Sequence, residues 1–283
     1  MAITVNAEKY FDDFKSPDIN GLTPEEKNYL RVLFKPGRSV QARELNQAQS
    51  FLQAQVDRLG QSLFGSNSPV IGAETSFDSN LSFIDVTFEN SDNNILKDWI
   101  ANDLISEVEL SENESTLKAI IIKIESLNTG DDLNDLTKRL FIRFSSGQPD
   151  TTESDLSFSD EVNLTIEALE FSINGTVSAS GRAISATINE GIFFTKGNFI
   201  KLSKQSRCQI LDSQEDFFTG FVLLKISEKE ISFGEDSTLL DNSSGSENYF
   251  GVGADRYQIE ATLEISKVLV EDSDDIVLLN IQD

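Results

Sequence analysis

"SVQARELNQAQSFLQAQVDRLGQSLFG", residues 39–65, is the stretch on which the fold prediction rests, because it reads as one long amphipathic helix. Leu45, Leu52 and Leu59 recur every seven residues, a spacing that places apolar side chains in one stripe along a helix. The stretch contains seven Gln or Asn residues and only four charged ones, although the whole chain has a formal net charge of −25. We predict a continuous helix over residues 40–64, with Gly65 as its C-terminal cap.

The stripe and the glutamines at its margins predict a surface that meets a second copy or a partner. Glutamine forms hydrogen bonds across such a surface without the cost of burying a charge. A helix with this stripe also packs on its own domain in many proteins, and the sequence leaves both destinations open. The predicted interface residues are Ala42, Leu45, Ala48, Gln49, Leu52, Gln55, Val56, Leu59 and Leu63.

Charge is distributed unevenly along the chain. Residues 1–64 hold eight Lys/Arg and eight Asp/Glu, whereas residues 65–283 hold fifteen against forty. An acidic surface repels phosphate backbones, so we expect no nucleic-acid partner. The neutral N-terminal quarter is where copies approach each other with least repulsion. No run of 18 apolar residues and no basic-then-apolar N-terminus is present, so we expect no membrane span and no signal peptide.

The rest of the chain predicts an α+β, mainly β fold: an N-terminal arm and a long helix, followed by antiparallel β subdomains. Residues 1–38 are predicted as an arm with a short helix that begins at Thr23, where "TPEE" has the pattern of a capping box. The long helix occupies 39–65. Residues 66–90 and 181–270 are predicted as the main β domain, 91–180 as an inserted acidic β subdomain, and 271–283 as an acidic C-terminal tail.

Alternating apolar and polar residues predict the strands. The stretches are "LSFIDVTFE", "LKAIIIKIES", "KRLFIRFSSG", "FTGFVLLKISEKEISF" and "ADRYQIEATLEISKVLV". "GIFFTKGNFIKL" predicts a hairpin whose arms are joined by Lys196-Gly197-Asn198. "EVNLTIEALEFSI" is a strand with a helix as the alternative, and "LKDWIANDLISEVEL" is a short helix or a loop.

The sequence contains no recognisable catalytic site. It contains no His, which removes the commonest general base and metal ligand and excludes nucleophiles activated by histidine. We therefore predict no enzyme, no cofactor, no bound metal and no small-molecule substrate. The acidic stretches "GDDLND" (130–135) and "EDSDD" (271–275) are candidate calcium ligands, but they lack EF-hand spacing and are interpreted as solvated loops. Cys208 is interpreted as an idle thiol.

Three stretches together resemble a known family. They are "NYLRVLFKPGRSVQARELNQAQSFLQAQVDRLGQSLF" (28–64), "INEGIFFTKGNFIKL" (188–202) and "DSTLLDNSSGSENYFGVGADRYQIEATL" (236–263). In this order they resemble a domain family of virion structural proteins from tailed bacteriophages, notably large contractile-tailed phages of aquatic bacteria. The resemblance implies a tail or baseplate component and supplies no catalytic residues.

The combined interpretation is a structural virion protein at the baseplate or the base of a tail fibre. It is made in the host cytoplasm and assembles, through its arm and helix, with itself as a trimer or another small closed oligomer, and with other tail proteins. The alternatives are a host-surface adhesin, for which Trp99 is the aromatic candidate, and a tail-associated glycan hydrolase. Turn chemistry in the third stretch predicts a structural loop. Its residues are Asp241, Asn242, Gly245, Gly253, Asp255, Arg256 and Tyr257.

Overall fold

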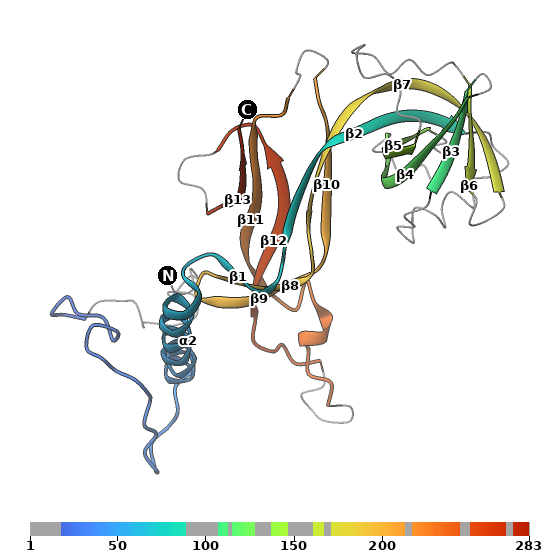
Figure 1. Cartoon of the computed structure of the whole chain (residues 1–283). Coiled ribbons are helices and arrows are strands. Elements are labelled where there is room, and N and C mark those ends of the chain that lie inside the picture. Colours follow the sequence, from blue (N-terminus) through green and yellow to red (C-terminus); the bar gives the residue numbers. More distant parts are fainter. Residues whose placement is uncertain are drawn as a thin grey trace.

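The computed structural model describes residues 18–88, 107–112, 115–127, 137–146, 161–166, 171–212, 217–243, 250–269 and 274–282. Within these ranges the chain is mainly antiparallel β-structure with one long helix, which confirms the coarse fold class (Figure 1). The helix lies at the base of a β body, and two strands run from this body to a second β unit at the far end.

The long helix, α2, spans Ala42–Phe64 and confirms the predicted helix apart from its first two residues. The Gln41 backbone N–H donates to the Glu44 carboxylate at 3.0 Å, so the first turn is closed by an acidic side chain as in a capping box. At the other end Gly65 has a φ of 78° and donates its N–H to the Gln61 carbonyl at 3.1 Å. Glycine adopts this backbone conformation readily, so the helix ends where the sequence predicts.

A small sheet lies beside the helix and consists of β1 (Ser68–Gly72), β8 (Gly191–Thr195) and β9 (Asn198–Leu202), in the order β1-β8-β9. The β8–β9 hairpin was predicted, and its turn is one residue tighter than expected because Asn198 already belongs to β9. Lys196 and Gly197 have φ values of 51° and 73°, the positive pair that a two-residue type I′ turn requires.

The body is a sandwich of two sheets. One consists of β11 (Gly220–Ile231), β12 (Arg256–Ser266) and β13 (Ile276–Ile281), in the order β12-β11-β13. The other is formed by β10 (Gln205–Ile210) and the adjoining parts of β7 (Phe171–Ile188) and β2 (Thr75–Phe88). Side chains of both sheets form one core together with Ala73, with Phe193 of β8 and with Leu202 of β9. The buried members are Ala73, Ala186, Ile188, Phe193, Leu202, Val222, Leu224, Ile226, Leu263 and Ile276.

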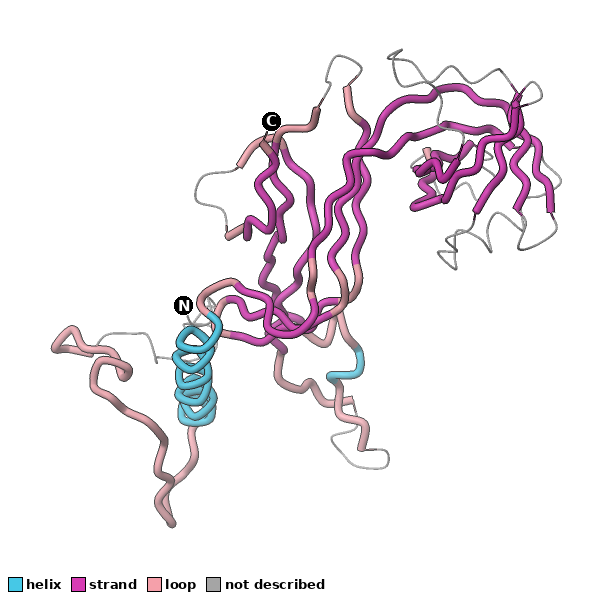
Figure 2. Tube along the Cα trace, viewed as in Figure 1, coloured by secondary structure: helices cyan, strands magenta, loops and turns pink. Residues whose placement is uncertain are grey.

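Strands β2 and β7 continue beyond the body and close a barrel at its far end (Figure 2). There they join β3 (Glu107–Glu112), β4 (Ser115–Ser126), β5 (Thr137–Ser146) and β6 (Glu161–Ile166). The pairing runs β7-β2-β5-β4-β3-β6 and returns to β7, so the six strands form a ring. Among the described residues of these strands, Ile84, Val86, Ile121, Leu140 and Ile142 are fully buried, and the ammonium of the buried Lys138 donates to the Ser126 hydroxyl at 2.8 Å. Closure leaves no free strand edge in the ring.

A second apolar cluster fills the corner between the barrel and the body. Phe83 and Phe141 point away from the barrel interior and pack with residues of β10 and β4. Asp85 and Arg139 flank this cluster, and the Arg139 guanidinium donates to both Asp85 carboxylate oxygens at 2.7 Å. This pair raises the pKa of Arg139. The members of the cluster are Leu81, Phe83, Phe141, Ala183, Ile122, Cys208 and Ile210.

The structure corrects several predictions about local segments. The tail predicted at 271–283 is wrong, because Ile276–Ile281 forms β13 and pairs with β11. The domain boundary predicted at 180/181 falls inside β7, which belongs to both the barrel and the body. The helix predicted from Thr23 is a single turn, which ends at Asn28 with a φ of 56°.

The structure also decides, in part, between the alternatives that the sequence left open for two segments. The stretch predicted as a strand or a helix around residues 161–173 supplies two antiparallel strands, β6 and the start of β7. The stretch predicted as a short helix or loop ends in a strand, because residues 107–110 belong to β3. Trp99, the fourth residue of that stretch, lies outside the described residues.

Candidate interface on the N-terminal helix and arm

One side of α2 packs on the β8–β9 hairpin. Gly60 lies so close to the Phe194 ring that a Cβ atom at this position would be 2.3 Å from it. The Gln53 amide donates to the Gly197 carbonyl in the hairpin turn. The Phe64 and Phe199 rings meet edge to face with their centroids 5.8 Å apart. Glycine thus permits the close approach, and the polar and aromatic contacts fix the helix on the hairpin.

A second side of α2 is covered by the arm. Phe51 and Ala54 are buried, and Val32 of the arm packs against them. The Arg58 guanidinium pairs with the Glu25 carboxylate at 2.9 Å, and both side chains are about half exposed. The arm and the hairpin therefore occupy two of the three sides of the helix.

The third side of α2 is the leucine stripe, and it is exposed. Leu45, Leu52, Leu59 and Leu63 are 52%, 65%, 59% and 64% accessible. Of the nine predicted interface residues, Ala48 is half-buried and the other eight are exposed. The described chain thus places all nine on one accessible face and covers none of them fully, and their burial in an assembly stays a prediction.

Exposed apolar side chains are concentrated in this part of the molecule. Among the described residues, 22 large hydrophobic ones are exposed, and 13 of these lie between Ile19 and Phe64, a span of 46 residues. They include Tyr29, Leu30 and Leu33 of the arm. Single exposed hydrophobic residues are ordinary, whereas a concentration of them marks a surface that contacts something. We define the exposed apolar residues of the arm and α2 as the candidate interface.

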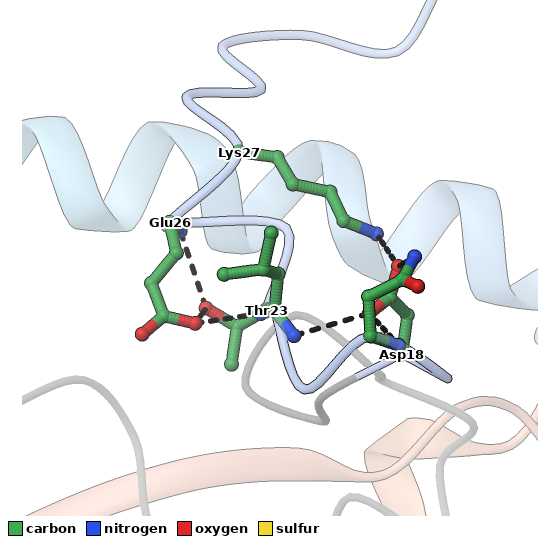
Figure 3. Close-up of polar contacts among 6 residues, drawn as sticks. Asp18, Thr23, Glu26 and Lys27 are labelled. Atoms are coloured by element: carbon green, nitrogen blue, oxygen red, sulfur yellow. Dashed lines mark hydrogen bonds and ion pairs between the residues drawn. The ribbon is translucent and has the colours of Figure 1, made fainter.

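The start of the arm is held by local polar contacts (Figure 3). The Asp18 carboxylate pairs with the Lys27 ammonium at 2.6 Å and accepts the Leu22 N–H at 3.0 Å, and these bonds hold the pKa of Asp18 well below its usual range. Thr23 and Glu26 form the predicted capping box, in which Glu26 accepts the Thr23 N–H at 2.7 Å and Thr23 Oγ1 accepts the Glu26 N–H at 3.2 Å. The first of these bonds lowers the pKa of Glu26. The described part of the arm therefore has a defined local conformation within the single chain.

The loop predicted to be structural makes the contacts of a turn. Asp241 accepts the Ser243 N–H at 2.8 Å, and its own N–H donates to the Gly251 carbonyl at 2.8 Å. A Cβ atom on Gly253 would lie 2.4 Å from the Leu239 carbonyl oxygen, which explains the glycine. Arg256 donates to the Ala254 carbonyl at 2.7 Å, as expected of a residue that fixes the loop.

The remaining residues predicted for this loop differ in their exposure and in their contacts. Asn242 is exposed, Asp255 is half-buried, and Gly245 lies outside the described residues. Tyr257 is part of β12, and its hydroxyl donates to the Glu228 carboxylate at 2.6 Å. Burial and this carboxylate raise the pKa of Tyr257 far above its usual range. Tyr257 therefore links β12 to β11 instead of shaping the loop.

The side chains that the sequence offers as a nucleophile or as metal ligands are buried, paired with another residue or outside the described ranges. Burial raises the pKa of the Cys208 thiol to about 11, so this residue is a thiol at neutral pH. Within the residues that the structure describes, no group of three or more acidic, His or Cys side chains is placed to hold a metal ion. The acidic loop at 130–135 lies outside them, and in the loop at 271–275 Asp274 pairs with Lys196.

Comparisons of the chain with protein-family models, curated proteins and solved structures found no match. Among the described helices, none has the length and apolarity needed to cross a membrane. Sequence reasoning identified the leucine stripe as one face of the helix, and it missed Phe51, Ala54 and Gly60, which hold α2 on the arm and the hairpin. A glycine inside a helix was the available signal for Gly60, because it often marks a close approach.

Proposed function

We propose that this protein is a structural assembly protein that associates through the leucine stripe of α2, in the setting of a bacteriophage tail at the baseplate or the base of a fibre. The observation that carries the proposal is the exposed stripe on a helix whose other two sides already pack within the chain. The three stretches that resemble tail proteins support the setting.

The free energy gained by burying the stripe is small enough that a stable assembly needs additional contacts. The four leucines are already about half covered, so full burial contributes roughly 1 kcal/mol for each of them. Two facing stripes thus contribute about 8 kcal/mol, similar to the estimated 4–15 kcal/mol that association costs. Association between free copies is therefore weak, and neighbours in a particle strengthen it by holding copies together. The expected unit is a trimer or another small closed oligomer.

Charge predicts how this association responds to salt. The acidic part of each copy, residues 65–283, carries the whole net charge of −25, so neighbouring bodies repel each other. The Debye length falls from about 30 Å at 0.01 M salt to about 10 Å at 0.1 M. Association through the neutral helix should therefore strengthen from low to moderate salt.

The test is a charge placed in the stripe of the full chain. Leu52→Glu with Leu59→Glu should abolish the oligomer in sedimentation velocity, while circular dichroism stays unchanged because both side chains are exposed in the single chain. The matched control is Val252→Glu with Val268→Glu, two exposed apolar residues outside the candidate interface, which should leave the oligomer intact. A stripe variant that still forms the same oligomer would refute this interface. Substitution is cleaner than removal of residues 1–64, because removal would uncover Phe194 and Phe199.

The setting needs a separate test, because a soluble oligomer does not by itself identify a tail. Electron microscopy of virions that carry a tag on this protein should show label at the baseplate or at the base of the fibres. Virions that lack the tagged protein would contradict the assignment even if the purified chain assembles through its stripe.

A further inference from the structure

Strand β13 presents an open edge of the body. Among the described strands β13 pairs with β11 alone, so one row of its backbone groups faces outward. The opposite edge of the same sheet is covered, because the Gln205 side chain bonds to the backbone of both Ala261 and Leu263 in β12. The sequence of β13, IVLLNI, has no charged residue and no proline. Edge strands usually carry such residues to prevent pairing with other chains, so β13 is a site where a further strand can add.

The arm contains a segment suited to such an edge. Tyr29–Phe34 runs between the capped turn and the Lys35–Arg38 turn without strand partners among the described residues (Figure 2). Val32 packs on α2, whereas Leu33 is 70% exposed. Arg31, Lys35 and Arg38 are exposed and form no ion pair with a described residue.

The charges of the two segments are complementary. Residues 27–43 contain five basic residues and no acidic one, which gives +5 in a chain of −25. Residues 271–283 contain five acidic residues and no basic one, which gives −5. The basic residues are Lys27, Arg31, Lys35, Arg38 and Arg43, and the acidic residues are Glu271, Asp272, Asp274, Asp275 and Asp283. Of these, Lys27 already pairs with Asp18 and Asp274 with Lys196, which leaves Arg31, Lys35 and Arg38 as the exposed charges of the arm. Attraction between segments of opposite charge both steers and orients their association.

We propose that the arm of one copy adds to β13 of a second copy as an antiparallel strand, with Tyr29–Phe34 opposite Ile276–Ile281. This contact goes beyond the proposed function, because it does not use the leucine stripe and because it gives the exposed arm residues of the candidate interface a specific target, β13 of a second copy. The second copy is the occupant because, within one chain, Val32 holds the arm on α2 and no described contact joins the arm to β13.

The direction and register follow from charge and length. An antiparallel arrangement places the Lys35–Arg38 turn beside the acidic residues that precede β13, whereas a parallel one places it at the other end. With Lys35 opposite Asp275, Leu33 stands opposite Val277, and the two six-residue segments match end to end. β13 contains an extra residue, Leu278, in its ladder with β11. This irregularity lies beyond Val277 when the register is counted from Asp275, so the Leu33–Val277 pair is retained.

A cysteine pair tests this geometry in the full-length protein. Directly opposed residues of antiparallel strands have Cα atoms about 4.5–5.5 Å apart, a separation that a disulfide spans. Leu33→Cys and Val277→Cys, made in separate copies with tags of different mass, should form a disulfide-linked heterodimer when they are mixed under mild oxidation. The matched control replaces Val277→Cys by Val252→Cys, an exposed residue of similar chemistry outside β13. We expect the heterodimer yield to exceed that of the control at least tenfold.

Further outcomes show whether the arm binds β13 of its own chain or of a second copy. They also separate a failure of the leucine stripe from a failure of the arm contact. Equal yields in the test and the control mixtures would overturn the proposal. A single chain that carries both cysteines and closes its own disulfide at high dilution would show that the arm binds its own β13, and this also overturns the proposal. In the Leu52→Glu, Leu59→Glu background the cross-link should persist, so a failed stripe and a failed arm contact are distinguishable.

Salt and charge reversal give a second readout. Because opposite charges hold this contact, added salt should lower the cross-linking rate, the opposite of the trend expected for the stripe. Arg31→Glu with Lys35→Glu should lower the rate at least tenfold at low salt. The matched control, Lys201→Glu with Lys204→Glu, makes the same change in net charge at exposed residues in and just after β9 and should leave the rate within about twofold. An equal loss in both variants would show that net charge alone, and not the arm, governs the approach.

Discussion

At the residue scale, helix propensity and side-chain packing have opposite effects on the stability of a variant at Gly60. Alanine is the better helix former and favours the helix by about 1 kcal/mol over glycine. At this position, however, a Cβ atom would lie 2.3 Å from the Phe194 ring, so the ring or the helix must move. Overpacking of this kind costs about 1–3 kcal/mol.

The difference between the two effects is up to about 2 kcal/mol, so Gly60→Ala should lower the free energy of unfolding by up to that amount in urea unfolding. The control is Ser62→Ala, an exposed position on the same helix, which should be neutral or slightly stabilising. If the two variants behave alike, the contact between the helix and the hairpin is looser than described.

The Asp85–Arg139 pair gives a second prediction at this scale. The Asp85 side chain is almost fully buried and accepts two hydrogen bonds from Arg139, which is about a quarter exposed. Asp85→Ala leaves the arginine without its partner beside an apolar cluster, and we expect a loss of about 2–3 kcal/mol in the free energy of unfolding. Glu260→Ala, which breaks the half-exposed pair with Lys229, should cost less than about 1 kcal/mol. Equal losses would mean that burial does not set the contribution of these pairs.

The capped turn of the arm should respond to acid. The pKa values of Asp18 and Glu26 are lower in the folded turn than in an unfolded chain, because both carboxylates accept hydrogen bonds and Asp18 also pairs with Lys27. The stabilisation is therefore fully present above the unfolded pKa of about 4 and is lost as the pH falls below it. Amide exchange at Leu22 should accelerate below about pH 4, after correction for intrinsic rates. Asp18→Asn should remove most of this pH response, and an unchanged response in that variant would contradict the assignment.

At the scale of the element, α2 shows which features of a helix a sequence pattern predicts and which it does not. The seven-residue spacing of leucines and the final glycine predict the helix and the apolar stripe along it. The pattern says nothing about the other two sides, because these depend on Val32 and on a hairpin more than 120 residues later in the chain. Local periodicity is a property of one segment, whereas the contacts of that segment depend on distant ones.

The β elements show the same division. Strands with clear alternation, such as β2 and β11, were predicted, and so was the β8–β9 hairpin. The six-residue β13 was missed because IVLLNI follows an acidic run and does not alternate. Barrel closure was also missed, since it depends on β6 pairing with a strand of 18 residues that serves both the barrel and the body. The pairing of β2 with β7 shifts register twice, between Asp78 and Leu81 and between Asp85 and Val86, so a period-two pattern does not run through it.

At the scale of the whole molecule, the body should fold without the barrel. Neither apolar cluster of the body includes a residue between Ser82 and Arg182. These two residues are paired in the ladder of β2 and β7, so a two-residue Asn-Gly turn between them should close a hairpin. The shortened chain should keep a cooperative thermal transition and its β-type circular dichroism.

The corner cluster is the part of the molecule that this deletion uncovers. Cys208 and Ile210 lose their cover from Phe83 and Phe141, so the shortened chain should be less soluble than the full one. Cys208→Ser with Ile210→Thr should restore solubility without a large change in the transition temperature. A shortened chain that remains unfolded in both forms would show that the barrel is needed for the body to fold.

The two long strands also determine how the molecule carries a mechanical load. A pull between the barrel and α2 runs along β2, because α2, β1 and β2 follow one another directly in the chain. The ladder that joins β2 to β7 lies parallel to this pull, so its hydrogen bonds are loaded in shear and must break together, instead of opening one at a time from an end. Tension along this axis therefore meets high resistance, whereas a sideways force on the barrel acts on the single apolar corner and swings the barrel as a lever.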